Sequence, residues 1–422
     1  MKPQLPLLLL GAAVACARAP EPGRLTPFRR GAALAAAGRC DTAAVVARAA
    51  LEREPDNALG PLVIGACQER AGRYDEAVAT YTDFAARHPR ARGVAALRAK
   101  AQLALRAAAE RTARQALARE AELANQPPQP ATVAVLPLVV AGNSTVQPLS
   151  RGLAELITTD LAYIRTLRLL ERLQIGMLLD ELKLGQSERV DPATAARVGR
   201  LLRAERLVQG TATIPARGPV QLSATVVTGS GIVRPVGQVS GPFAKLLDLE
   251  KQVVFDLAAQ LGLELTQAER ERILRQGPKS LAAFLAYSRG LEAMDRGDYG
   301  AAARHFRSAA QADPSFQAAR DGQQTATAAP AAERATGGGI VTMVDAVEGA
   351  TGVAEPTSLG AATGLLSAGA RDVVPAIGDV IGDVRLPTGG STIDRQLTPE
   401  SLGLPSIVSV ANGIVIIFKR PP

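Results

Sequence analysis

The chain has 422 residues, of which 47% are apolar and 21% are charged, so it is long enough for two or three domains with hydrophobic cores and is not disordered as a whole. Its net charge of +8 invites a nucleic-acid interpretation, but only seven of the 48 basic residues are lysines, and the arginines are spread along the whole chain. Aromatic residues make up 3% and tryptophan is absent, so little is available to stack on bases, and we expect no nucleic-acid partner.

The N-terminus has the features of an export signal. Lys2 precedes the apolar run LPLLLLGAAVAC, which is too short to span a bilayer as a mature helix and has the length of a signal peptide's hydrophobic region. We therefore predict a signal peptide at residues 1–15 and a short tether at residues 16–26. The segment AVAC resembles a bacterial lipobox, which favours Cys16 as a lipidated first residue that anchors the protein to a membrane. The neighbouring alanines also fit cleavage by an ordinary signal peptidase.

Residues 27–89 repeat with a period of 34 residues. A shift by 34 places Gly31, Gly38, Arg39, Asp41, Ala43 and Pro55 on Gly65, Gly72, Arg73, Asp75, Ala77 and Pro89. The same frame returns in residues 283–316 with Gly290, Gly297, Tyr299, Ala302, Phe306, Ala309 and Pro314. Small residues at these offsets let two antiparallel helices approach closely, and the proline ends the second helix. The pattern resembles the tetratricopeptide repeat.

The resemblance implies a domain of two helical hairpins and a capping helix, residues 27–125, and a third hairpin at residues 278–320. The capping helix is predicted within residues 91–125, which hold no proline and no glycine after Gly93. The third hairpin cannot bury its apolar face alone, so we expect it to pack on another part of the chain or on another subunit. Cys40 and Cys67 lie inside the first two repeats, where we expect buried filler residues, with a disulfide as the alternative.

Residues 131–275 have the pattern of an α/β domain that begins after the helix-breaking segment NQPPQPA. A β-branched run at 132–140 predicts a buried strand, and residues 148–164 follow as an amphipathic helix. A strand at 166–172, a helix at 173–184 and a helix capped by Asp191 come next. Strands at 205–214 and 219–229, a third near 232–240 and a long helix at 244–265 complete the domain.

This order resembles the CsgG family of bacterial envelope proteins over about residues 132–272. The residues that carry it are VAVLPL, LAELITTDLA, LLERLQIGMLLDELKL, DPATAARVGRLLRAERLVQGTAT and TGSGIV. The family includes a curli-secretion lipoprotein, but the simple curli channel lacks tetratricopeptide repeats. The expected fold class is therefore α+β and multidomain, with helical repeat hairpins flanking a three-layer-type α/β domain that has a mixed sheet.

Residues 321–395 are rich in glycine, alanine and threonine and are expected to be flexible.

The C-terminal segment, residues 396–422, is β-prone. Asn412-Gly413 between two β-branched runs indicates a hairpin turn, with an aggregation-prone end as the alternative.

No set of residues in the sequence assembles into a catalytic, cofactor or metal site. His88 and His305 have no metal-ligand neighbours, and repeat packing explains them and the two cysteines better than a Cys-His nucleophile does. Glycine clusters at 229–231 and 337–339 lack the lysine of a phosphate loop and are interpreted as turn and linker. Asp180 with Glu181, or Glu171 with Arg172, could be proposed as acid/base catalysts. We interpret them instead as solvated faces or ion pairs.

These observations favour a non-catalytic envelope lipoprotein on the periplasmic side of the bacterial outer membrane. It would act as a scaffold or assembly factor that binds other envelope proteins through its repeat groove and is held at the membrane by its lipid anchor. A subunit of a curli-type secretion channel is the alternative, for which one candidate lipid-facing hairpin, 219–240, is found. Homo-oligomers fit either function. We expect no enzymatic activity and no cofactor.

Overall fold

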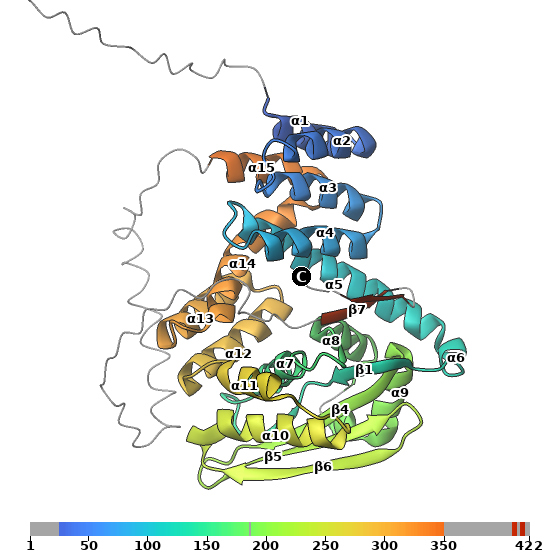
Figure 1. Ribbon diagram of the computed structural model, residues 1–422, viewed down its shortest axis with the longest axis vertical. Coiled ribbons are helices and arrows are strands. Elements are labelled where there is room, and N and C mark those ends of the chain that lie inside the picture. Colours follow the sequence, from blue (N-terminus) through green and yellow to red (C-terminus); the bar gives the residue numbers. More distant parts are fainter. Residues whose placement is uncertain (1–24, 185–186, 350–406, 412–413, 418–422) are drawn as a thin grey trace, which may run out of the picture.

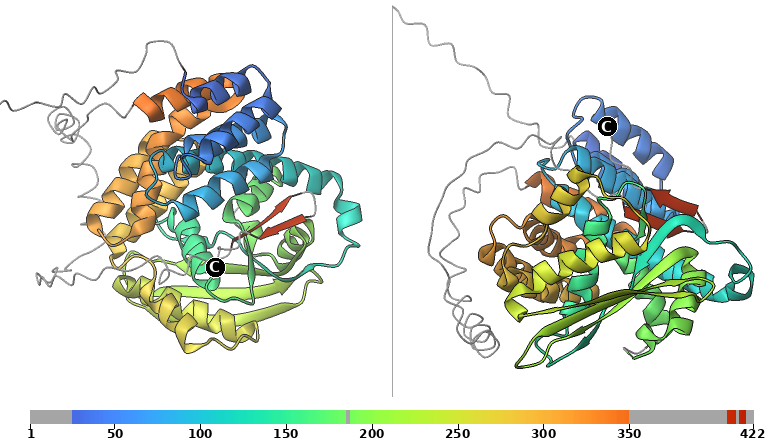
Figure 2. Two further views of the ribbon diagram at one scale, coloured as in Figure 1. Left: turned by 45° about the horizontal axis from the view of Figure 1, so that its top comes forward. Right: turned by 60° about the horizontal axis from the view of Figure 1, so that its bottom comes forward.

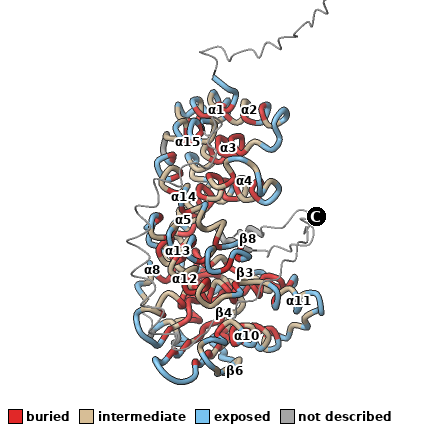
Figure 3. The backbone as a smooth tube through the Cα atoms, turned by 90° about the vertical axis from the view of Figure 1, so that its left-hand side faces the viewer, coloured by how far each residue is buried: buried red, intermediate tan, exposed pale blue. Residues whose placement is uncertain are grey.

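The computed structural model describes residues 25–184, 187–349, 407–411 and 414–417. Helices stack at one end of the molecule, and a sheet with helices packed on it lies at the other (Figure 1). Buried residues occur along the whole length of the molecule (Figure 3). The predicted signal peptide, Cys16 and nearly all of the predicted tether lie outside the described residues.

The N-terminal helices form two antiparallel hairpins followed by a long helix. They are α1 (Pro27–Ala36), α2 (Cys40–Leu51), α3 (Leu59–Arg70), α4 (Tyr74–Arg87), α5 (Val94–Ala118) and the short α6 (Glu120–Leu123). Gly38 and Gly72 follow the first helix of each hairpin with φ values of +78° and +70°, which glycine adopts without the steric cost of a Cβ. The helices expected at 27–89 and 91–125 are therefore present.

Cys40 and Cys67 form a disulfide that links the start of α2 to the end of α3. The expectation that they are buried filler was wrong. Their Cα atoms lie 5.3 Å apart, which is within the range that a disulfide requires. The two cysteines come together because α2 and α3 pack against each other.

The chain returns to the N-terminal helices after the sheet. The returning elements are α12 (Leu281–Asp295), α13 (Tyr299–Ala312), α14 (Gln317–Arg334), the π-helical segment Ala335–Gly339 and α15 (Ile340–Gly349). Helix α14 packs on α5, and α15 packs on α1 and α3. Arg29 on α1 forms an ion pair with Glu348 on α15 at 2.7 Å. Side chains from both groups of helices share one hydrophobic core.

Two predictions about this region were wrong. Residues 321–349 are helical rather than flexible, and the glycine cluster 337–339 is part of a π-helical segment rather than a linker. Small side chains such as Ala326, Ala329 and Ala332 are almost fully buried, so packing on α5 compensates for the lack of large apolar residues. The rest of the segment expected to be flexible, residues 350–395, lies outside the described residues.

Helix α5 was expected to cap an open end of the array, and this was also wrong. It packs on α4, on α14 and on α8 (Arg172–Glu181) of the α/β domain, so it lies in the interior between three parts of the chain. Arg98 of α5 pairs with Asp321 of α14 at 2.7 Å. Lys100 is completely buried and donates to Glu69 Oε2 of α3 at 2.6 Å. Helix α5 thus connects the N-terminal hairpins, the third hairpin and the α/β domain.

The α/β domain contains a mixed sheet. Its strands are β1 (Gln129–Val135), β2 (Val139–Ala141), β3 (Arg168–Leu170), β4 (Ala204–Thr213), β5 (Val220–Thr228) and β6 (Val233–Gly241). Among the described residues the sheet has the order β6-β5-β4-β1-β3-β7-β8, and β2 pairs with β4. Strand β1 is parallel to β3 and β4, whereas β5 is antiparallel to β4 and β6. The buried run expected at 132–140 is divided into β1 and β2.

Helices cover both faces of this sheet and produce three layers. Helices α7 (Leu149–Leu161) and α10 (Leu246–Gln260) share a core with Val133, Val208 and Val226. Helices α8 and α9 (Pro192–Leu202) pack instead with Ala134, Leu207 and Val227. Alternate residues of the strands therefore face opposite layers. Helix α11 (Gln267–Arg275) and the 3₁₀ segments Ser187–Val190 and Phe243–Lys245 complete the domain.

The predicted C-terminal hairpin is present as a pair of strands. Strands β7 (Ile407–Ala411) and β8 (Ile414–Ile417) are antiparallel, and β7 is parallel to β3, so the tail extends the sheet. Figure 2 shows these strands beside the sheet domain in both views. The expected turn residues 412–413 lie outside the described residues. None of the helices within the described ranges is long and apolar enough to cross a membrane.

The helices of the second and third hairpins make the same close contact. A methyl group on Gly65 would lie 2.2 Å from Cε1 of Tyr81, and one on Gly290 would lie 2.5 Å from Cδ1 of Phe306. Tyr81 is fully buried, and its hydroxyl donates to Glu69 Oε1 at 2.7 Å, so its ring has little room to move. The glycines at this offset are required because an aromatic ring occupies the space of a side chain.

Gly65→Ala is expected to lower the free energy of unfolding by about 1 to 3 kcal/mol, because the added methyl group overpacks a fixed aromatic contact. Gly176→Ala in α8 is the matched control, since a Cβ at Gly176 meets no atom within 4 Å. That variant should gain about 0.5 to 1 kcal/mol from helix propensity. Urea denaturation followed by circular dichroism measures both, and equal shifts in the two variants would contradict the packing argument.

Candidate functional site

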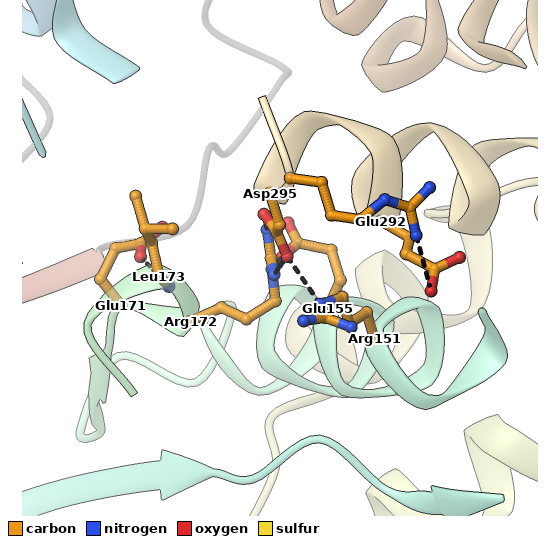
Figure 4. A network of polar contacts seen from close by, with 8 residues as sticks. Arg151, Glu155, Glu171, Arg172, Leu173, Glu292 and Asp295 are labelled. Atoms are coloured by element: carbon orange, nitrogen blue, oxygen red, sulfur yellow. Dashed lines mark hydrogen bonds and ion pairs between the residues drawn. The ribbon is translucent and has the colours of Figure 1, made fainter. Parts of the chain in front are cut away.

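Charged side chains join the α/β domain to the third hairpin (Figure 4). Arg172, the first residue of α8, donates from Nη1 to Asp295 Oδ2 at 2.6 Å and from Nη2 to Oδ1 at 3.0 Å, which is bidentate geometry. Its Nε donates to Glu155 Oε2 of α7 at 2.9 Å. Arg151 of α7 donates to Asp295 Oδ2 at 2.8 Å. We call Arg151, Glu155, Arg172 and Asp295 the junction cluster.

The central pair of the junction cluster is buried and ionised. The side chains of Arg172 and Asp295 are 9% and 8% exposed. Burial alone would raise the pKa of Asp295, but the charges and hydrogen bonds of Arg172 and Arg151 outweigh it and hold this pKa below its usual range. Burial opposes the charge on Arg172 as well, yet Asp295 and Glu155 raise its pKa well above the ordinary value. The cluster therefore works as a charged connection between two parts of the chain.

Glu171 acts as the N-cap of α8, where its carboxylate accepts from the backbone N–H of Leu173. Burial raises the pKa of Glu171 to about 7, while neighbouring Arg172 opposes this rise and Glu155 adds to it. The expectation of an ion pair is confirmed for Arg172, whereas Glu171 serves as a helix cap. Glu181 likewise pairs with Arg114 of α5 at 3.0 Å, and Asp180 is exposed.

A second buried group of charges lies between α7 and α10. Asp160 and Glu250 are both 0% exposed, and Lys251 donates to Asp160 while its Nζ lies 3.4 Å from Glu250 Oε2. One ammonium therefore serves two carboxyl groups. Burial raises the pKa of Asp160 to about 6 despite the opposing effect of Lys251. Burial and the charge of Asp160 raise the pKa of Glu250 well above its ordinary value.

This pair predicts that the protein becomes less stable as the pH rises from about 4 through 6 and above. Because both carboxyl pKa values are raised by folding, the folded state binds protons more tightly, and that stabilisation is lost once the pH passes the folded pKa values. Glu250→Gln should reduce the slope of the melting temperature plotted against pH in this range, since the amide resembles the protonated carboxyl group. Glu264→Gln, at an exposed position, should leave the slope unchanged. An unchanged slope in Glu250→Gln would refute the prediction.

The remaining residues considered from the sequence do not come together in a reactive arrangement. His88 Nδ1 lies 2.8 Å from Asp56 Oδ1, and its ring contacts Phe84. The disulfide occupies both cysteines, so the Cys-His pair considered above does not form. Burial and neighbouring arginines lower the pKa of His305. No group of three or more His, Cys, Asp or Glu residues that could hold a metal is present within the described ranges.

The second hairpin carries two exposed arginines, Arg70 and Arg73. Arg73 is exposed and pairs with Glu76 at 3.0 Å, so its charge is available to solvent. Arg70 Nη1 donates to the carbonyl of Ala36 at 3.3 Å, which ties the first hairpin to the second. Arg73 is therefore the cleaner probe of the surface, whereas a change at Arg70 also removes a contact between hairpins.

The junction cluster could not be predicted from the sequence. Asp295 lies 123 residues from Arg172 and 144 residues from Arg151, and nothing in the local pattern distinguishes it from a solvent-facing residue at the end of a repeat helix. The one available signal was the expectation that the third hairpin packs on another part of the chain. The structure confirms that packing, since α12 contacts α7, and side chains of α12 and α13 share a core with α5.

Comparison with known protein families gives a match within the α/β domain. Residues 131–214 match the family described as "Curli production assembly/transport component CsgG". This segment runs from β1 through β4 and contains Arg151, Glu155 and Arg172, the three residues that the α/β domain contributes to the junction cluster. The match supports CsgG-family membership for this segment. No curated protein matches the chain.

Proposed function

We propose that this protein is a non-catalytic envelope lipoprotein that binds other envelope proteins and acts as a scaffold or assembly factor. The main support is the connection of an array of helical hairpins to a CsgG-like domain through α5 and the junction cluster. A stack of helical hairpins presents an extended surface for a partner segment, and a buried charged junction holds that surface in a constant position relative to the sheet.

The helical hairpins are proposed to be tetratricopeptide repeats. Three observations support this: the 34-residue frame, the left-handed glycine after the first helix of each hairpin, and the glycine–aromatic contact shared by the second and third hairpins. In the third hairpin Gly297 has a φ of +77°, close to the values of Gly38 and Gly72. Repeats of this kind bind extended or helical peptides in most of their known uses.

The proposed location is the periplasmic face of the outer membrane, with the chain anchored through a lipid on Cys16. The lipobox-like segment supports the anchor, and the disulfide agrees with an oxidising compartment. Loss of palmitate labelling in Cys16→Ser is the test. Label that persists in this variant, or a mature chain that begins after residue 17, would leave simple secretion in its place.

The scaffold function predicts partner capture that depends on the repeat surface. Crosslinked envelopes that contain the tagged protein should yield a discrete partner, and Arg73→Glu should reduce its recovery by about tenfold or less, since an exposed charge contributes modestly. Arg217→Glu on an exposed loop of the α/β domain is the matched control with the same change in charge. Equal recovery from all three proteins would count against the repeat surface as the binding site.

A subunit of a secretion channel is the second candidate, and the description of the matched family favours it. It predicts ring-shaped oligomers in detergent and conductance in planar bilayers. Monomers or small oligomers without conductance would leave the scaffold function in place. Hydrolysis of a nucleotide or a peptidoglycan fragment that is lost on changing one acidic residue would overturn both.

A further inference from the structure

A cavity of about 450 Å³ lies at one end of the sheet, and none of its lining residues belongs to the junction cluster. Its walls come from the start of β4, the end of β5, the start of β6, the C-terminal end of α9 and the segment at residues 124–128 that leads into β1. Cavities of this size hold small molecules or single polar head groups. Nothing described above assigns a role to this site.

Four arginines line the cavity, namely Arg200, Arg203, Arg206 and Arg234. Strand register relates two of them, because Arg206 pairs with Thr228 across β4 and β5, and Arg234 pairs with Val226 across β5 and β6. Residues 226 and 228 point to the same side of β5, so the side chains of Arg206 and Arg234 share one face of the sheet. Arg200 and Arg203 reach the cavity from the end of α9.

The guanidinium groups of these arginines have N–H donors that are not all bonded within the protein. Arg200 Nη1 donates to the carbonyl of Gly229 at 2.9 Å, and Arg203 Nη2 donates to that of Pro127 at 3.2 Å. Each guanidinium has five N–H donors, and the buried Nε of Arg203 has no hydrogen-bond partner among the described residues. Arg234 is exposed and has no ion-pair partner in the described part of the chain. Donors therefore remain available for a ligand.

The charge balance of the cavity also distinguishes it from an ordinary basic surface. Arg203 reaches the cavity from the C-cap position of α9, where its φ of +51° is the left-handed conformation in which many helices end. Glu205 is the one carboxylate among the described residues that line it, and its Oε2 already accepts from Ala131 N at 2.5 Å. Arg206 Nη2 lies 3.3 Å from Glu205 Oε1, which neutralises one of four positive charges. The cavity retains an excess of positive charge.

We propose that this cavity binds the phosphate group of a small anionic ligand. Planar guanidinium groups donate in pairs to phosphate oxygens, and several of them around one pocket suit a group with up to two negative charges better than a single carboxylate. The hydroxyls of Thr228 and Ser230, which also line the cavity, can add hydrogen bonds. The phosphate belongs either to a soluble phosphorylated compound or to a lipid head group, and the experiment distinguishes these sources.

Calorimetric titration of the full-length protein at constant ionic strength provides the test, with two probes. Inorganic pyrophosphate represents a soluble ligand, and dihexanoyl phosphatidylglycerol below its micelle concentration represents a lipid head group. Arg234→Gln and Arg203→Gln are each expected to weaken binding about tenfold or more, since each removes a charge-assisted donor. Arg217→Gln, which removes an exposed arginine outside the cavity, should leave the affinity unchanged.

Glu205→Gln should instead increase the affinity, because it removes the negative charge from the cavity while its amide oxygen can still accept from Ala131. An increase in affinity cannot result from general damage to the fold, so this variant distinguishes a specific site from misfolding. A melting curve for each variant verifies folding. Binding of pyrophosphate alone supports a soluble ligand, whereas tighter binding of the lipid supports a head group. If neither probe binds, or if Arg217→Gln weakens binding as much as the cavity variants do, the proposal is overturned.

Discussion

Asp295→Asn is expected to lower the free energy of unfolding by about 3 kcal/mol or more. The carboxylate of Asp295 is the bidentate partner of Arg172, whose side chain is only 9% exposed, and it also receives Arg151. The asparagine keeps the shape of the side chain but removes its charge. The buried guanidinium of Arg172 then retains only one ion-pair partner, Glu155, whose side chain is 30% exposed. Removal of one partner from a buried ion pair costs this much because the remaining charge is desolvated without compensation.

The matched control for Asp295→Asn lies one turn away on the same helix. Glu292 pairs with Arg296 at 3.1 Å in an i,i+4 arrangement, and the arginine is 59% exposed. Glu292→Gln should therefore change the stability by less than about 0.5 kcal/mol. Urea denaturation followed by circular dichroism measures both variants. A loss in Asp295→Asn no larger than that in Glu292→Gln would show that the junction cluster contributes little to the attachment of the third hairpin.

Removal of the Cys40–Cys67 disulfide is expected to destabilise the N-terminal hairpins by about 3 to 4 kcal/mol. The bond closes a loop with a sequence separation of 27 residues, and the loss of conformational entropy that it imposes on the unfolded chain grows with loop length. The hairpins depend on it because their interior is built largely of alanine, which buries little apolar area per residue. Either Cys40→Ala with Cys67→Ala, or reduction of the native protein, should produce this loss.

Hydrogen exchange localises the effect of the disulfide better than a global melting curve. Amides of α1 and α2 should lose protection, while those of β4 and β5 in the α/β domain should keep it, because the bond lies outside that domain. Reduction of the double alanine variant should have no further effect. Uniform loss of protection across both regions would mean that the array and the α/β domain unfold as one unit.

The sequence alone determined the elements that depend on local pattern. The 34-residue frame located the helices of all three hairpins, since each hairpin repeats the same glycine and proline offsets and the second and third also share the aromatic ones. Alternation along residues 220–228 identified β5, and Asp191 was correctly assigned as the cap of α9, where it accepts from Thr194 N. These features follow from backbone periods and short-range hydrogen bonds, which involve only neighbouring residues.

The tertiary structure alone decided the features that depend on contacts between distant segments. Helices α14 and α15 have the composition of a flexible segment, and their alanines become a core only because α5, α1 and α3 supply the opposite surface. The spacing of Cys40 and Cys67 carries no information on their distance, which the packing of α2 on α3 sets. Asp295 meets Arg172, and Arg234 and Arg206 come to line one cavity, only after helices and strands have packed, because side-chain chemistry at one position does not specify a partner more than a few residues away.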